Sequence, residues 1–310
     1  MKNIKSQPPF RYPGSKYRAF KYIKPFIDAS VFDEYREPFL GGGGVFFSNC
    51  FDEKTIIWLN DYDKDLMNAY KTIQNPDGLE YIISHLNEYT PSKENFEVLK
   101  NENPTNKYKK ATNYFLINRT AYSGIMNLPN WGFHPIKSVQ PDKWPSRLIE
   151  ANNKLQDCNL SSLDFEEVIN APASGNNVLL FLDPPYFAAD QKRAYVKSFK
   201  LEDHIRLCEC LKKTNYQFIL TYDDCPEIRE MYSWANIHEE SWRYQTANTL
   251  KTTRKIGNEL IITNFWVFFK WNKINFPLIF YSKCYLISCY FISVIIFKYR
   301  CFFIAIFIWC

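Results

Sequence analysis

Residues 177–186 read NVLLFLDPPY, an apolar run that leads directly into Asp183, Pro184, Pro185 and Tyr186. An apolar run of this length between turn signals is typical of a buried strand. The two prolines lack N–H donors, so the backbone after the strand presents carbonyl oxygens beside one carboxylate and one aromatic ring. The tetrapeptide therefore predicts a site that accepts hydrogen bonds from an amino group and stacks on its ring system. The alternative is an ordinary strand-ending turn.

Two further apolar runs end in polar residues in the same way. Residues 55–59 lead into Asn60 and Asp61, and residues 217–220 lead into the sequence TYDD. Ligands of parallel sheets bind at the carboxyl ends of the strands, so we expect these polar residues to form one site.

Amphipathic segments separate the predicted strands. Residues 201–213, for example, carry apolar side chains at helical spacing. Strands that alternate with helices predict an α/β, Rossmann-like fold with a mostly parallel sheet. Residues 259–265 read as a final strand, which we expect to be antiparallel at or near an edge of the sheet.

A glycine turn follows another predicted strand. Residues 34–38 lead through Phe39 and Leu40 into Gly41–Gly44, where the backbone can approach a ligand closely. Asp61 follows about 20 residues later at the end of the next strand, which is where an acid binds ribose hydroxyls in dinucleotide-type sites. The glycines do not have the G-x-G-x-x-G spacing, which argues against an ordinary NAD site.

The composition excludes disordered and collagen-like proteins, because 46% of the 310 residues are hydrophobic and 23% are charged. The length fits two domains or one large domain with an insertion. The net charge of +5 comes entirely from the region after Trp266, which holds five of the 38 basic residues and none of the 33 acidic ones. Residues 1–266 are therefore neutral, and we expect any contact with nucleic acid to use local basic patches.

The nine cysteines contain no C-x-x-C pair, and the chain has only four histidines. We therefore expect no metal site, and we expect reduced thiols in a cytoplasmic protein. The first residues, MKNIKSQPPF, lack the apolar segment of a signal peptide.

The alternation of strands and helices stops between residues 66 and 151, which are polar and helical in pattern. We interpret this stretch as an inserted helical domain. Residues 1–65 and 152–266 then form the catalytic domain.

The composition changes abruptly in residues 267–310, which contain no glycine and no acidic residue. The longest uncharged stretch, residues 284–297, is shorter than the roughly 20 residues that span a bilayer. We favour translation past the ancestral end of the gene, by frameshift or readthrough. A tilted membrane anchor and a partner-covered extension are the alternatives.

Several of these motifs, in this order, resemble the Dam-type DNA adenine N6-methyltransferases, the alpha group and D12 class of the amino-methyltransferases. The matching pieces are RYPGSK at 11–16, EPF at 37–39 with the glycines, ND at 60–61, LDF at 163–165 and DPPY at 183–186. The resemblance implies S-adenosylmethionine as the methyl donor and assigns catalysis to Asp183, Pro184 and Tyr186. The cofactor-binding residues that it implies are Tyr12, Lys16, Glu37, Pro38, Gly41, Gly42, Gly43, Asp61, Asp164, Phe165 and Asp183.

The predicted insertion carries a second resemblance, to the target-recognition segment of this family. Residues 113–124 read NYFLINRTAYSG, similar to the family's LNR…Y(N/S)G pattern. Asn127 stands where GATC-specific members have an arginine, and an amide cannot replace the arginine fork on guanine, so the resemblance does not carry GATC specificity. Arg119 fits a structural role as well as a contact to DNA. The candidate DNA-binding residues are Arg119, Tyr122, Asn127, Lys192 and Arg193.

The function that the resemblance implies is methyl transfer to N6 of an adenine flipped out of duplex DNA. We expect a monomer without a metal ion, with a cognate restriction endonuclease as a separate partner in a restriction–modification setting. The same DPPY site could instead act on cytosine N4, on RNA or on a protein amide. A third hypothesis is an inactive DNA- or membrane-associated protein that results from the altered C-terminus.

Overall fold

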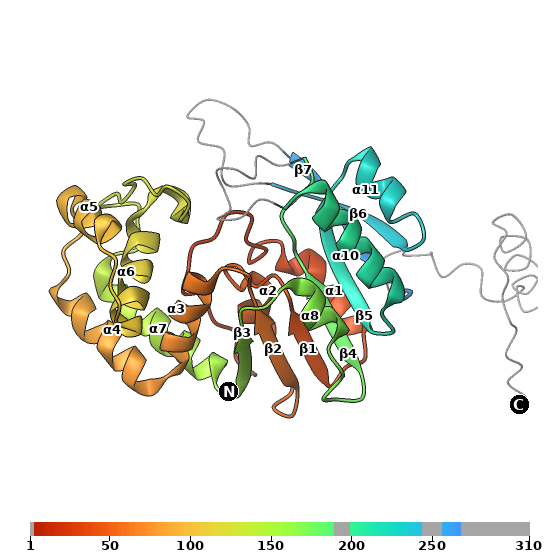
Figure 1. The fold of residues 1–310 in the computed structure, drawn as a ribbon, viewed down its shortest axis with the longest axis horizontal. Helices are drawn as coiled ribbons and strands as arrows, with labels where there is room; N and C mark the ends of the chain where they lie inside the picture. The colour runs from red at the N-terminus through yellow and green to blue at the C-terminus, as the bar shows by residue number, and fades with distance from the viewer. Residues whose placement is uncertain (1–2, 189–198, 244–255, 268–310) are drawn as a thin grey trace, which may run out of the picture. The chain divides into compact units, whose positions relative to one another are not determined.

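The computed structural model describes residues 3–188, 199–243 and 256–267, which belong to one compact unit, Met1–Phe268 (Figure 1). The second unit, Phe269–Cys310, lies outside the described residues, and so do the hypotheses about the apolar tail. In the described part of the chain, no helix has the length and apolarity to cross a membrane.

A seven-stranded sheet forms the centre of this unit, in the order β3-β2-β1-β4-β5-β7-β6. Strands β3, β2, β1, β4 and β5 are parallel, whereas β7 is antiparallel to β5 and to β6. The predicted α/β fold with a mostly parallel sheet is therefore confirmed. The strands are β1 Glu34–Glu37, β2 Ile56–Asn60, β3 Cys158–Ser161, β4 Val178–Leu182, β5 Gln217–Asp223, β6 Asn236–Arg243 and β7 Ile256–Thr263.

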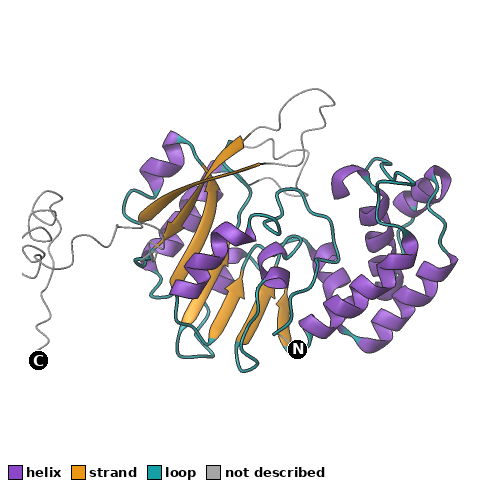
Figure 2. Cartoon of the chain, turned by 180° about the vertical axis from the view of Figure 1, so that it is seen from behind, coloured by secondary structure: helices purple, strands orange, loops and turns teal. Residues whose placement is uncertain are grey.

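Helices cover both faces of the sheet (Figure 2). The helices in the described part of the chain are α1 Phe20–Ala29, α2 Gly44–Ser48, α3 Lys64–Gln74, α4 Pro76–Glu88, α5 Lys93–Asn101, α6 Lys107–Thr120, α7 Trp144–Leu155, α8 Phe165–Asn170, α10 Leu201–Lys213 and α11 Pro226–Met231, with short 3-10 turns at Tyr122–Gly124 and Pro141–Lys143. Side-chain caps begin several of them, such as Asp63 for α3 and Ser92 for α5. The helix predicted over residues 201–213 is α10.

The central strands bury alternate residues in two hydrophobic clusters, one on each face. In β4, Leu179 and Phe181 belong to the cluster that includes side chains of α1, α2, α3 and α7. Val178, Leu180 and Leu182 belong to the other cluster, with side chains of α8, α10 and α11. Because successive side chains of a strand point to opposite faces, β4 is buried on both sides, and all five of its residues are apolar.

Helices α4, α5 and α6 lie beyond the β3 end of the sheet, away from β5 and β6 (Figure 1). Helix α6 packs mainly on α3, and one hydrophobic cluster runs from these helices to the sheet. The boundaries expected at residues 66 and 151 fall inside α3 and α7. The division into a catalytic domain and an inserted target-recognition domain stays a prediction.

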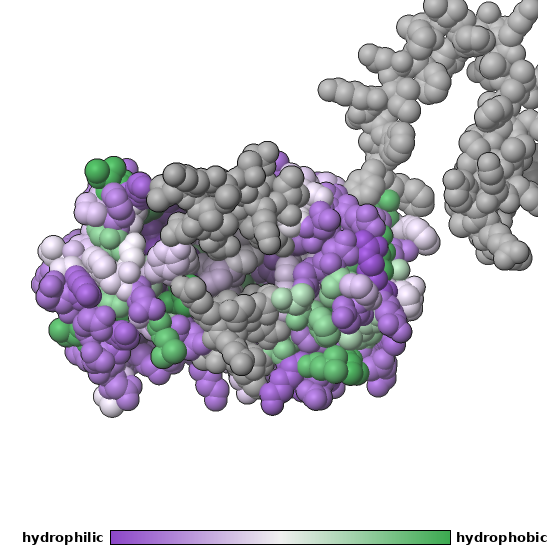
Figure 3. Space-filling model, turned by 90° about the horizontal axis from the view of Figure 1, so that it is seen from above, coloured by the Kyte–Doolittle hydropathy of each residue, from purple (hydrophilic) through white to green (hydrophobic). Residues whose placement is uncertain are grey.

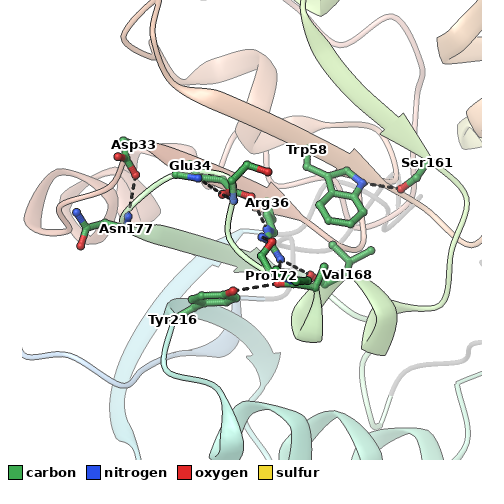
Figure 4. A network of polar contacts seen from close by, with 12 residues as sticks. Asp33, Glu34, Arg36, Trp58, Ser161, Val168, Pro172, Asn177 and Tyr216 are labelled. Carbon is green, nitrogen blue, oxygen red and sulfur yellow. Dashed lines mark hydrogen bonds and ion pairs between the residues drawn. The ribbon is translucent and has the colours of Figure 1, made fainter.

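At the amino ends of strands β1, β4 and β5, which we call the amino edge, a polar network surrounds Arg36 (Figure 4). Arg36 is fully buried and pairs with Glu34 at 2.7 Å. Its other guanidinium nitrogens donate to the carbonyl oxygens of Val168, Ala171 and Pro172, at the end of α8. The network therefore attaches α8 to the sheet, and every charge in it has a partner.

Candidate active site

At the opposite, carboxyl edge of the sheet, the glycine turn after β1 has a backbone that only glycine adopts readily. Gly41 and Gly43 have φ angles of 48° and 66°, in the left-handed region. A Cβ atom at Gly42 would lie 2.8 Å from Cβ of Tyr12, so the turn packs too closely for a side chain. Helix α2 begins directly after the turn. Its first residues, Gly44 and Val45, line a pocket at this edge of the sheet, so their backbone N–H groups lie beside that pocket.

Asp61 follows β2 and holds this turn in place. One of its carboxylate oxygens accepts from the N–H of Gly41 at 2.7 Å, and the other accepts from the N–H of Asp63 at 2.9 Å. Burial raises the pKa of Asp61 from 3.8 to about 6, against the effect of these two hydrogen bonds. Each oxygen keeps a second lone pair, so the carboxylate can also accept from a ligand hydroxyl.

Glu37, the last residue of β1, is a second acid of the site and is 2% exposed. Its carboxylate accepts a hydrogen bond from the Tyr35 hydroxyl at 2.8 Å. Burial raises the pKa of Glu37 well above its usual value, and the nearby charge of Asp183 raises it further, although the bond from Tyr35 opposes the shift.

Asp183 follows β4 and lies at the centre of the polar contacts. Its carboxylate is 2.7 Å from Nζ of Lys16 and accepts from the Thr221 hydroxyl at 2.7 Å. Lys16 is 5% exposed and also donates to the carbonyl oxygen of Gly14. The lysine of the RYPGSK segment therefore contacts the acid of DPPY directly, across 167 residues of sequence.

Tyr186 completes this group. Lys16 Nζ lies 4.6 Å from the centre of the Tyr186 ring, and the Tyr186 hydroxyl donates to Glu259 of β7. The next two backbone N–H groups, of Phe187 and Ala188, donate to Asp223 at the end of β5. Glu259 thus binds the Tyr186 hydroxyl, and Asp223 binds the backbone of the turn that follows β4.

These elements surround a pocket of about 340 Å³. The pocket is lined by every predicted cofactor residue except Gly43, namely Tyr12, Lys16, Glu37, Pro38, Gly41, Gly42, Asp61, Asp164, Phe165 and Asp183. Seven acids line it, against three basic residues: Glu37, Asp61, Asp63, Asp65, Asp164, Asp183 and Asp203 against Lys16, Lys64 and Arg206. An excess of carboxylates favours a ligand that carries positive charge and hydroxyl donors.

Aromatic rings form one wall of the pocket. The rings of Phe39 and Phe165 stack with their centres 5.4 Å apart, and the Arg206 guanidinium lies 4.5 Å above Phe165. Arg206 also pairs with Asp164 at 2.9 Å, while Asp164 caps the start of α8. Arg206 was not predicted, because an arginine on the polar face of an amphipathic helix carries no signal of a site.

Three of the candidate DNA-binding residues are in the described part of the chain, and none of these three lines the pocket. Lys192 and Arg193 lie outside the described residues. Arg119 lies in the last turn of α6 and is 5% exposed, and its Nε has no hydrogen-bond partner among the described residues. Burial and the charges of Arg147 and Arg11 lower the pKa of Arg119 to about 9. Tyr122 begins the 3-10 turn after α6.

Asn127 follows the same turn and is half-buried. The segment is fixed to the N-terminal motif, because Asn118 accepts from the Arg11 N–H at 2.8 Å and donates to the Arg11 carbonyl oxygen at 2.8 Å. The two resembling segments, RYPGSK and NYFLINRTAYSG, are therefore in direct contact.

Among the described residues, no group of three or more His, Cys, Asp or Glu side chains could hold a metal ion. The surface seen from above in Figure 3 is mostly hydrophilic where residues are described, and hydrophobic residues form small separate patches. This face suits a polar partner.

Comparison with known proteins decides the family. Residues 12–246 match the family described as D12 class N6 adenine-specific DNA methyltransferase. The chain belongs to this family. The match confirms the family predicted from the motifs, and with it the DNA adenine-specific methyltransferase activity. D12 class enzymes generally depend on S-adenosylmethionine.

Curated relatives of this D12 class chain carry matching names. The type II methyltransferase M1.LlaDCHI of Lactococcus lactis subsp. cremoris is 26% identical over 286 residues, which cover 84% of this chain and 96% of the relative. The type II methyltransferase M.CviBI of Paramecium bursaria Chlorella virus NC1A is 27% identical over 267 residues, with 83% and 97% covered. A DNA N-6-adenine-methyltransferase of Escherichia phage P1 is 25% identical over 254 residues, which are 76% of this chain and 32% of the relative.

Proposed function

We propose that S-adenosylmethionine binds in the pocket between the glycine turn and DPPY. The observation that carries this proposal is the acidic lining of the pocket directly beside Asp183. Asp61 would hold the ribose hydroxyls, and Phe165 with Phe39 would pack on the adenine ring. Glu37 and Asp183 would face the positively charged part of the cofactor. When bound, the cofactor supplies an electrophilic methyl group on a sulfonium.

Asp183, Pro184 and Tyr186 would hold the target adenine after it has left the duplex. The carboxylate of Asp183 and the carbonyl oxygen of Pro184 accept hydrogen bonds from the two hydrogens of the N6 amino group. These bonds turn the nitrogen lone pair out of the ring system. The Tyr186 ring stacks on the base. The Asp183 carboxylate would also accept the proton that N6 loses when it takes the methyl group, and would pass it to solvent, while the cofactor would leave as S-adenosylhomocysteine. Alignment of the two reactants supplies much of the rate.

Contacts to double-stranded DNA would come from Arg119, Tyr122 and Asn127, together with Lys192 and Arg193. Arg119 supports this assignment best, because no acid neutralises its buried guanidinium in the described part of the chain, and a DNA phosphate would supply the missing charge. We also propose that the enzyme is a monomer and acts in the cytoplasm. The type II names of the relatives support a separate cognate restriction endonuclease.

The test is a methylation assay with purified protein, labelled S-adenosylmethionine and genomic double-stranded DNA. We expect label in N6-methyladenine after digestion and mass spectrometry, and Asp183→Ala should lower turnover at least about 100-fold because the amino group loses its main acceptor. By calorimetry, the variant should bind S-adenosylmethionine within a few-fold of wild type.

The exposed Asp52 provides a matched control, since Asp52→Ala removes a carboxylate far from the pocket lining. It should keep wild-type turnover. Label in N4-methylcytosine, or more than about a tenth of wild-type turnover in Asp183→Ala, would contradict the proposal.

A further inference from the structure

Glu259 is a buried acid that belongs to none of the motifs matched to the family. It lies on β7, directly across from Asp223 of β5, and is fully buried. Its carboxylate accepts the hydrogen bond of the Tyr186 hydroxyl and lies 3.9 Å from Nζ of Lys16. Since Lys16 also contacts Asp183, Glu259 touches one side chain of DPPY directly and the other through Lys16.

The sheet itself does not need an acid at this position. The neighbours of Glu259 on β7, from Leu260 to Ile262, are apolar and fully buried. An ionised side chain that is removed from water is costly to bury, and replacing a buried ion pair by apolar side chains often leaves a protein as stable or more stable. The contacts that Glu259 makes therefore point to a role outside the stability of the strand.

Those contacts define the position of the Tyr186 ring. A tyrosine side chain rotates about two bonds, and a hydrogen bond at the hydroxyl fixes the far end of the ring. Lys16 lies over one face of the same ring, 4.6 Å from its centre. On β5, Asp223 holds the two backbone N–H groups that follow Tyr186. Glu259 of β7 thus fixes the hydroxyl of Tyr186, and Asp223 of β5 fixes the backbone that follows Tyr186.

We propose that Glu259 is a positioning residue for methyl transfer. It acts through the Tyr186 hydroxyl, sets the plane of the ring on which the target base stacks, and holds Lys16 beside Asp183. This inference rests on the proposed function of DPPY. It adds a residue from the last strand, 73 positions after Tyr186, to the machinery of the site.

The first experiment compares Glu259→Ala with Glu239→Ala, a matched control on the neighbouring strand β6. Glu239 is 70% exposed and pairs with Arg229. We expect Glu259→Ala to lower kcat about tenfold, with S-adenosylmethionine affinity within about threefold of wild type, because the ring and not the cofactor pocket is disturbed. Glu239→Ala should keep wild-type kcat.

The second experiment tests whether Glu259 acts through the hydroxyl. Tyr186→Phe keeps the ring and removes only the donor, so it should lower kcat by a similar factor while the KM for DNA stays within about threefold. In the Glu259→Ala/Tyr186→Phe double variant the two losses should not multiply: kcat should stay within about threefold of either single variant. Glu259→Gln keeps an acceptor for the hydroxyl and should lose less than Glu259→Ala.

Three results would overturn the inference: wild-type kcat in Tyr186→Phe, losses that multiply in the double variant, or cofactor affinity that falls in parallel with kcat. If Glu259→Ala does not fold, as judged by its thermal midpoint, Tyr186→Phe and Glu259→Gln still decide between these outcomes. The wild-type assay separates the two proposals. An inactive wild type overturns the proposed function and this inference with it, whereas an active wild type with an equally active Tyr186→Phe overturns this inference alone.

Discussion

The two edges of the sheet differ in how Glu34 and Asp33, at one edge, and Glu37 and Asp61, at the other, are held. At the amino edge, Glu34 pairs with Arg36 and accepts from the N–H groups of Ser174 and Gly175, and Asp33 accepts several hydrogen bonds that lower its pKa. At the carboxyl edge, Glu37 and Asp61 form no ion pair with any described residue, and burial raises their pKa values.

This difference favours the carboxyl edge as the site of a ligand. A carboxylate that accepts hydrogen bonds or ion pairs from the protein stabilises the fold. Ionisation of a carboxylate that is buried without a cation costs free energy, and a positively charged ligand can offset this cost. Perturbed pKa values tend to cluster at functional sites for this reason. Glu34 and Asp33 therefore stabilise the fold at the amino edge, whereas Glu37 and Asp61 at the carboxyl edge lie beside Asp183 and Asp164, which pair with Lys16 and Arg206.

Arg36→Met should produce the largest effect, on stability. The variant leaves Glu34 buried at 1% exposure without its cation and frees three carbonyl oxygens at the end of α8. Breaking one side of a buried ion pair costs about 3–5 kcal/mol, and we expect the free energy of unfolding in urea to fall by that amount. The turnover of the molecules that remain folded should be unchanged, because the site lies at the other edge.

The double variant Glu34→Gln/Arg36→Met is the control. Glutamine removes the unpaired charge and keeps an acceptor for Ser174 and Gly175, so it should recover part of the lost stability. A loss of less than about 1 kcal/mol in Arg36→Met would mean that the amino edge is not held by its charges.

A smaller effect is expected from titrating Asp61. Its pKa of about 6 means that the carboxyl is protonated below that pH in the free protein. If the cofactor binds the ionised form, its affinity should be constant above pH 7 and fall about tenfold as the pH is lowered to 5, since about one molecule in ten is then ionised. Calorimetry across this range measures it.

Asp61→Asn separates Asp61 from the other acids of the pocket. The variant should bind S-adenosylmethionine about tenfold more weakly at pH 7, as expected for a lost charge-assisted hydrogen bond. Its affinity should also change less with pH. An equal pH dependence in both proteins would assign the titration to another group, and the contrast between the two edges would no longer rest on Asp61.

Much of the fold was predictable because its signals are local. DPPY and Asp61 each follow an apolar run, the glycine turn follows the strand predicted at residues 34–38, and the rule that ligands meet the carboxyl ends of parallel strands brings them together. Strands β3 and β6 were not predicted. They are the two edge strands, and their sequences, CNLS and NIHEESWR, lack the apolar runs of β2, β4 and β5.

The final strand was predicted as antiparallel at or near an edge, and β7 lies next to the edge strand β6. The contacts that Lys16 and Glu259 make could not be predicted from the sequence. Lys16 and Asp183 are 167 positions apart, and Tyr186 and Glu259 are 73 positions apart. The spacing of apolar residues does not indicate which side chains at the ends of different strands are in contact.

Asp33→Asn should give the smallest effect, and it tests the sign of the contrast. Asp33 accepts from the N–H groups of Asn176 and Asn177, and these bonds lower its pKa below 3.8. A lowered folded-state pKa stabilises the fold at every pH above the unfolded value, and the contribution is lost as the pH falls through the folded value. Asp61 has the opposite sign, because its ionisation costs stability as the pH rises from 3.8 to about 6. The thermal midpoint of Asp33→Asn should therefore lie slightly below wild type at pH 7, by much less than that of Arg36→Met, and the difference should shrink as the pH is lowered below 4. A difference that grows toward acid pH would show that the amino edge also stores the free energy of unmatched carboxylates, and the contrast between the edges would fail.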